Sequence, residues 1–124
     1  RSHQEPGAVI HGAPSARTCH LGMNSVLLAE SAIGEECIEG AMSFVKAVAV
    51  FPKRKLIVGN PATVIKDVSD DMIAWKTAGT ALYQQLPSDC YESLEEVAPL
   101  REIPKERPIQ EDFYKTLQEI KRKD

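Results

Sequence analysis

The sequence predicts a mainly β fold with a C-terminal α portion: a left-handed parallel β-helix of hexapeptide repeats, followed by one or two helices. Two observations lead to this prediction, a six-residue period in the first half and helical apolar spacing in the second. Residues 1–50 contain 8 of the 33 charged residues, and residues 51–124 contain the other 25. We therefore expect a short β-helix over residues 1–66 and a helical extension over residues 67–124 that packs on it.

The period of six appears at two positions of each step between residues 7 and 45. The first is small in all seven steps, and the second, two residues later, is aliphatic in five of seven. The small residues are Gly7, Ala13, Cys19, Ser25, Ser31, Cys37 and Ser43, and the aliphatic ones are Val9, Leu21, Leu27, Ile33 and Val45. Side chains two apart share one face of a strand, so both sets should point into a narrow interior. A period of six cannot keep one face of a 3.6-residue helix in register.

Three such steps make a coil of 18 residues, so residues 18 apart should lie one above the other. Cys19 and Cys37 are such a pair, and we interpret them as small buried thiols, with a disulfide as the alternative. Glu39 falls at an inward position, where a carboxylate is costly unless it is paired. We therefore expect it near the lower end of the stack, where the coil loosens.

The six-residue period also predicts where the glycines and histidines lie in the coil. Gly22, Gly34 and Gly40 follow the aliphatic position, where a corner can use their backbone freedom. The same phase sends His3 to an inward position, His11 to a corner and His20 to an outward face. The spacing therefore predicts that the three histidines point in different directions.

The second half begins with a Gly-Asn-Pro turn in "VGNPATVI" (residues 58–65), which follows a final strand. Ser69 should cap a helix that runs from about residue 70 to Leu86, with Asp70 and Asp71 in its first turn. Its apolar residues are Met72, Trp75, Leu82, Tyr83 and Leu86. We expect them to pack along the β-helix, although Trp75 and Tyr83 could instead line a ligand cleft.

A proline-rich connector leads from this helix to a predicted terminal amphipathic helix that ends in "KRKD". The apolar face of the terminal helix consists of Ile109, Phe113, Leu117 and Ile120. The cations at its end suit the C-terminal pole of a helix dipole.

Composition excludes several classes of function. A net charge of −3 and a pI near 5.6 give no reason to expect nucleic acid or an anionic membrane as a partner. No signal peptide and no apolar run of roughly 18 residues is present, so we expect a cytoplasmic protein. Three cysteines without CxxC spacing indicate neither a disulfide framework nor a zinc knuckle.

The repeat, together with "VIHG", "LGMNSV", "VGNPA" and "WKTAGTALYQQL", resembles the γ-class carbonic-anhydrase-like hexapeptide proteins. Within them it looks most like the branch of the phenylacetate-degradation and carnitine-operon proteins. The likeness runs from about residue 3 to Leu86. It implies trimers with active sites between subunits, where three histidines hold a divalent metal, usually zinc.

Two of these histidines come from a "GHGAxxHG" segment. Aligning its final "HG" places one ligand at His11 and the other at Pro6, which has no nitrogen lone pair to offer. The third ligand belongs to an upstream coil that this chain does not contain. The resemblance therefore implies a zinc site of which this chain carries only His11.

Three functions remain open at this point. The resemblance implies metal-dependent hydration of carbon dioxide or chemistry on a CoA thioester, with an activated water as nucleophile. The alternatives are a hexapeptide acyltransferase that uses acyl-CoA and a histidine base, and a noncatalytic oligomeric or ligand-binding protein. The expected partners are two further copies of the chain and a small-molecule or CoA-ester ligand. If the chain is a fragment of a longer one, the metal-dependent function is favoured more strongly.

Overall fold

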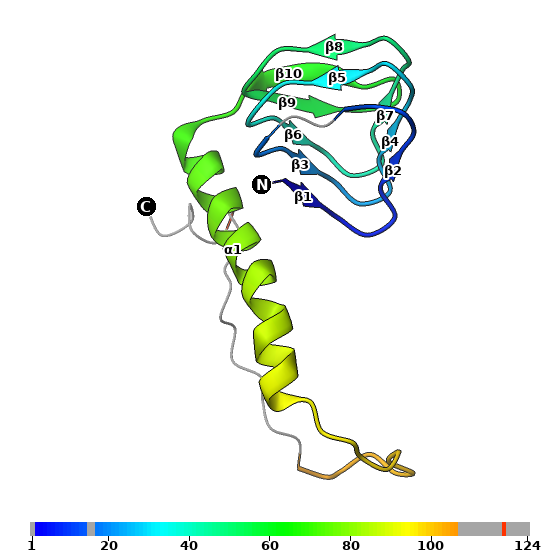
Figure 1. Cartoon of the computed structure of the whole chain (residues 1–124), viewed down its shortest axis with the longest axis vertical. Helices are drawn as coiled ribbons and strands as arrows, with labels where there is room; N and C mark the ends of the chain where they lie inside the picture. Colours follow the sequence, from blue (N-terminus) through cyan, green and yellow to red (C-terminus); the bar gives the residue numbers. More distant parts are fainter. Residues whose placement is uncertain (1, 15–16, 107–117, 119–124) are drawn as a thin grey trace. The chain divides into compact units, whose positions relative to one another are not determined.

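The hexapeptide pattern folds into three columns of short parallel strands in the computed structural model, which describes residues 2–14, 17–106 and 118 (Figure 1). One column contains β1 (His3–Gln4), β3 (His20–Leu21), β6 (Ile38–Glu39) and β9 (Lys55–Val58), to which β10 (Thr63–Asp67) adds an antiparallel edge. The second contains β2 (Val9–Ile10), β4 (Val26–Leu27) and β7 (Phe44–Val45), and the third β5 (Ala32–Ile33) and β8 (Val50–Phe51). The described fold is thus mostly sheet, followed by one helix, α1 (Asp70–Ser93).

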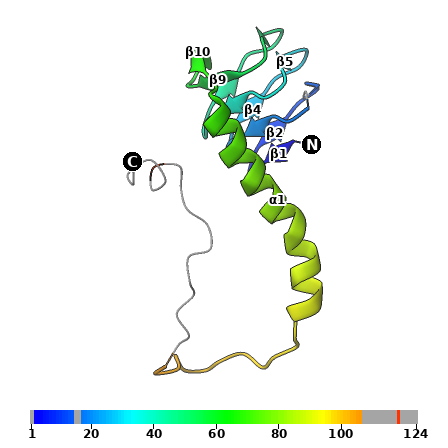
Figure 2. The same ribbon diagram turned by 90° about the vertical axis from the view of Figure 1, so that its left-hand side faces the viewer.

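Most of the coils contain 18 residues, as predicted. His20 pairs with Ile38, Val26 with Phe44, and Ala32 with Val50, so successive coils lie in register (Figure 2). The core is the inward column of small and aliphatic side chains that the period identified. Its buried members are Cys19, Leu21, Leu27, Ile33, Cys37, Val45 and Ile57.

The first coil differs because it is one residue shorter. His3 pairs with His20 and Val9 with Val26, a register of 17 residues. The missing residue lies between β2 and β3, because β1 and β2 keep their normal spacing of six. As a result Ile10, rather than Val9, lies beside the inward Leu27. The predictions that Val9 and His3 point inward are therefore wrong.

The corners of the coil recur every six residues and use the left-handed backbone conformation. The residues with φ between 54° and 62° are Thr18, Asn24, Glu30, Glu36, Met42, Val48 and Arg54. Gly7 and Gly12 take the same conformation in the first coil, with φ of 76° and 65°. Gly22, Gly34 and Gly40 do not, so their expected corner role is wrong. A Cβ atom on Gly22 or Gly34 would lie 2.5 Å from a backbone nitrogen of the next coil, and one on Gly40 would lie 2.7 Å from Val58 Cγ1. Close approach between coils, rather than positive φ, requires glycine there.

The core contains two cysteines and one glutamate, and the predictions for them differ in outcome. Cys19 and Cys37 are free, buried thiols, and each donates its S–H to a backbone carbonyl 3.1 Å away. Burial raises the pKa of both thiols. Glu39 points inward as predicted, but it lies between Leu21 and Ile57 in the middle of the stack and is fully buried. Its expected place at a loose end of the coil is therefore wrong.

Helix α1 begins as predicted and ends later than predicted. The Ser69 hydroxyl accepts a hydrogen bond from Met72 N at 3.3 Å, as an N-cap does. The helix continues through Pro87 to Ser93 instead of ending at Leu86, although an interior proline removes a backbone donor and crowds the preceding turn. Within the described residues, no helix is both long and apolar enough to cross a bilayer. Apart from residue 118, the predicted terminal helix over residues 109–120 lies outside the described part of the chain.

The chain forms two compact units, residues 1–80 and 81–124. In the first unit, Lys76 is the buried residue of α1, and its Nζ donates a hydrogen bond to the Thr18 carbonyl. Trp75 is half-buried. In the second unit Tyr83 and Leu86 are exposed.

Candidate metal site

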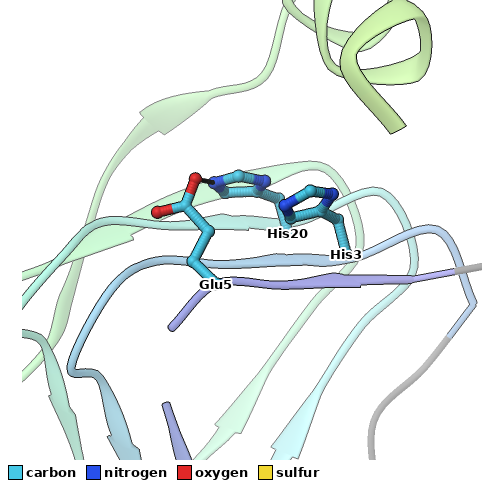
Figure 3. Close-up of side chains that lie close together, drawn as sticks. All are labelled: His3, Glu5 and His20. Carbon is cyan, nitrogen blue, oxygen red and sulfur yellow. Dashed lines mark ion pairs between the residues drawn. The ribbon is translucent and has the colours of Figure 1, made fainter. Parts of the chain in front are cut away.

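His3, Glu5 and His20 come together on the outer face of the first strand column (Figure 3). His3 lies on β1 and His20 on β3, and the 17-residue register places them directly side by side. Their rings stack, with centroids 5.3 Å apart and an interplanar angle of 19°. Glu5 follows β1, and its Oε1 lies 3.3 Å from His20 Nε2.

The Glu5 carboxylate is held from both sides. Its Oε2 accepts a hydrogen bond from Met23 N at 3.1 Å, while its Oε1 faces His20. Met23 and His20 belong to the second coil, whereas Glu5 belongs to the first. The carboxylate therefore spans the two coils and its orientation is fixed.

Electrostatics favours a neutral imidazole at His20. Burial lowers the pKa of His20, and the nearby His3 and Lys76 lower it further, while Glu5 opposes them. A histidine must be neutral to bind a metal. The environment of His20 therefore favours the form that acts as a ligand.

The three side chains offer a donor set typical of transition metals. One donor atom from each residue lies within 4.8 Å of the others. Two histidines and a glutamate are a known zinc donor set, in which bonds of about 2.1 Å place tetrahedral donors about 3.4 Å apart. Binding therefore requires rotation of the side chains to bring the donors closer together.

The sequence pointed to a different residue. His11 lies directly after β2, where its backbone N donates to Leu27 O at 2.9 Å and its side chain is exposed. It is not part of the His3, Glu5 and His20 cluster. Pro6 is also exposed. A role of His11 as a metal ligand stays a prediction.

An unbroken period of six through the first coil predicts different faces for His3 and His20, which the 17-residue register instead places side by side. The available signal was their spacing of 17, one residue short of a full coil. Glu5 had no signal beyond its place two residues after His3, which puts both on one side of an extended strand.

No family model matches the chain. It is 45% identical over 106 residues, 86% of its length, to the carnitine operon protein CaiE of Escherichia coli strain K12, and 44% identical to that of strain O7:K1. The chain spans about half (54%) of the length of these curated relatives.

Two solved structures share the fold. A putative acetyltransferase from Bacillus cereus has a TM-score of 0.62 at 23% identity, over 76% of this chain and 62% of its own. A hexapeptide transferase family protein from Anaplasma phagocytophilum has a TM-score of 0.63 at 17% identity, over 66% and 49% of the two chains. Both fit the predicted left-handed β-helix.

Proposed function

We propose, from the premise that this chain is a homologue of the carnitine operon protein CaiE, that it forms part of a trimeric metal-dependent enzyme. Its substrate would be a small carbonyl compound, either carbon dioxide or a CoA thioester. The observation that carries the proposal is the 45% identity over 86% of the chain. It agrees with the family to which the sequence motifs pointed.

In this proposal His11 is a zinc ligand. A catalytic zinc generally has three protein ligands and, when bound, supplies an activated water as the nucleophile. His11 fits such a role in one respect, because its side chain is exposed while its backbone is fixed to β4. Pro6 cannot supply the second ligand. The remaining ligands must therefore come from neighbouring subunits or from parts of the protein outside this chain.

Sedimentation and activity assays of the same protein test this proposal. Protein expressed with added zinc should sediment at about three times the chain mass of 13.7 kDa and hydrate carbon dioxide or hydrolyse a CoA-thioester panel. His11→Ala should lower kcat/KM by at least about a hundredfold because a lost ligand disrupts the metal site. Lys46→Ala is the matched control, since Lys46 is exposed and holds the equivalent place after β7.

Two results would contradict the proposal. Unchanged turnover in His11→Ala would exclude this histidine as a ligand. Absence of both activities in the zinc-loaded protein would favour the noncatalytic alternative, or the acyltransferase alternative if acetyl transfer to an acceptor panel were observed.

A further inference from the structure

We propose that His3, Glu5 and His20 form a second divalent-metal site, which fastens the first coil of the β-helix to the second. The inference goes beyond the proposed function because it uses neither His11 nor any catalytic step. It concerns a site within one chain, whereas the proposed catalytic metal needs ligands from outside it.

Little of the first coil is packed into the core: Ile10 and Ala13 contact it but are only half-buried. None of the residues 2–14 is buried, whereas Cys19, Leu21, Ser25 and Leu27 in the next coil are completely buried. Burial of apolar surface is the main source of stability in a packed core. The first coil therefore depends mainly on backbone hydrogen bonds such as His3 N to Cys19 O and Val9 N to Ser25 O, both shorter than 3.0 Å.

The proposed ligands bridge this weak junction. Two of them, His3 and Glu5, belong to the first coil, and His20 belongs to the second. A metal bound to all three would link the coils through coordinate bonds in addition to the hydrogen bonds. Its binding free energy would stabilise the bridged state, because the separated coils cannot offer the three ligands at once.

Charge and donor type indicate which metals fit. Two imidazoles and one carboxylate suit zinc, cobalt or nickel, whereas magnesium and calcium prefer sites made of oxygen donors. The Glu5 carboxylate offsets part of the metal charge. The Lys76 ammonium acts on His20 through its charge, and it would oppose the binding of a cation there.

The test measures Zn²⁺ binding to the untagged chain by competition with a chromophoric chelator. Hydrogen exchange of the amides of His3, Val9 and His11 is followed in the same samples. We expect one equivalent of Zn²⁺ at this site and at least tenfold slower exchange of these amides when it is bound. Mg²⁺ at the same concentration should change neither measurement.

The variants Glu5→Gln and His20→Ala should each weaken Zn²⁺ binding at least tenfold and abolish its effect on exchange. Glu5→Gln is the more informative, because a glutamine oxygen can still accept the hydrogen bond from Met23 N and keep the turn folded. His11→Ala should retain both effects.

Two results would overturn the inference. One is a Zn²⁺ affinity of Glu5→Gln equal to that of the wild type. The other is Zn²⁺ binding that leaves the amide hydrogen exchange of the first coil unchanged. Loss of binding in His11→Ala with normal binding in Glu5→Gln would assign the metal to the proposed catalytic site alone. Failure of the proposed function would instead appear as a missing activity with the zinc-dependent protection of the first coil intact.

Discussion

Glu39 is the most unusual residue of the core. It takes the inward position that Leu21 and Ile57 fill in the adjacent coils. Among the described residues, neither carboxylate oxygen has a hydrogen-bond partner of good geometry. Burial raises the pKa of Glu39 to about 7, and the nearby Ser25 hydroxyl only partly opposes this increase. The β-helix therefore holds a carboxyl group that changes its charge near neutral pH.

This pKa predicts that the β-helix loses stability as the pH rises. Between about pH 4.5 and 7 the unfolded chain releases the Glu39 proton while the folded chain keeps it. The contribution of Glu39 to the free energy of unfolding should therefore fall across this window by about 3 kcal/mol and remain low above it. Urea denaturation of wild type and Glu39→Gln at several pH values measures it. A stability difference between the two proteins that does not change with pH would contradict the assignment.

Replacing Glu39 with an aliphatic residue should stabilise the protein. Glu39→Ile continues the column of Leu21 and Ile57 and removes a buried charge without a partner. At about pH 8 we expect the free energy of unfolding to increase by about 2 kcal/mol. Glu35→Ile, at an exposed position, is the control and should give no such gain. A less stable Glu39→Ile protein would mean that the carboxyl has a partner in solution.

At the level of the elements, the corners from Thr18 to Arg54 each hold one non-glycine residue in a strained conformation. Left-handed backbone costs roughly 1–2 kcal/mol for most L-residues, and asparagine tolerates it better than valine. Asn24 is a residue that tolerates this conformation, whereas Val48, at φ 58°, is one that does not. The coil geometry imposes this conformation, and the packed strands on either side maintain it.

Val48→Asn should therefore raise the stability by about 1 kcal/mol, since Val48 is 67% exposed and its replacement removes little buried surface. Thermal unfolding followed by circular dichroism would show a higher Tm. Val50→Asn provides the comparison, because Val50 is also exposed but lies on a strand, and it should not stabilise. Equal effects of the two substitutions would disprove the role of backbone strain.

The elements also show what the sequence could predict. The inward column from Cys19 to Val45 was predictable, because small and aliphatic residues recur there with Glu39 as the one exception. The phase of the first coil was harder to predict, since a residue lost between β2 and β3 changes neither neighbouring strand and only the spacing of 17 between His3 and His20 reflects it. β10 was missed because all five of its residues are exposed, so it has no alternation of apolar and polar side chains.

At the scale of the molecule, Lys76 connects segments that are far apart in the sequence. It is 4% exposed, and its Nζ donates to the carbonyl of Thr18, 58 residues earlier. Burial lowers the pKa of Lys76, while Cys19 and Glu36 oppose this change. No sequence pattern marks this contact, because a lysine on a helix normally faces solvent.

Lys76→Ala should destabilise the first unit by about 1–3 kcal/mol, because it removes a buried side chain and leaves the Thr18 carbonyl without its donor. Lys66→Ala, at an exposed position of β10, is the matched control and should stay within about 0.5 kcal/mol of wild type. Chemical denaturation provides both values. A Lys76→Ala protein as stable as the control would show that the contact contributes nothing to folding.

The shortened first coil has a consequence for how such proteins can change in length. In a flat sheet, a one-residue deletion inside a strand turns every later side chain to the opposite face. Here the missing residue lies between β2 and β3, and from β3 onward the strands keep the same faces as the coils that follow. The chain between β2 and β3 can thus change in length by one residue while the interior from Leu21 to Ile57 keeps its phase.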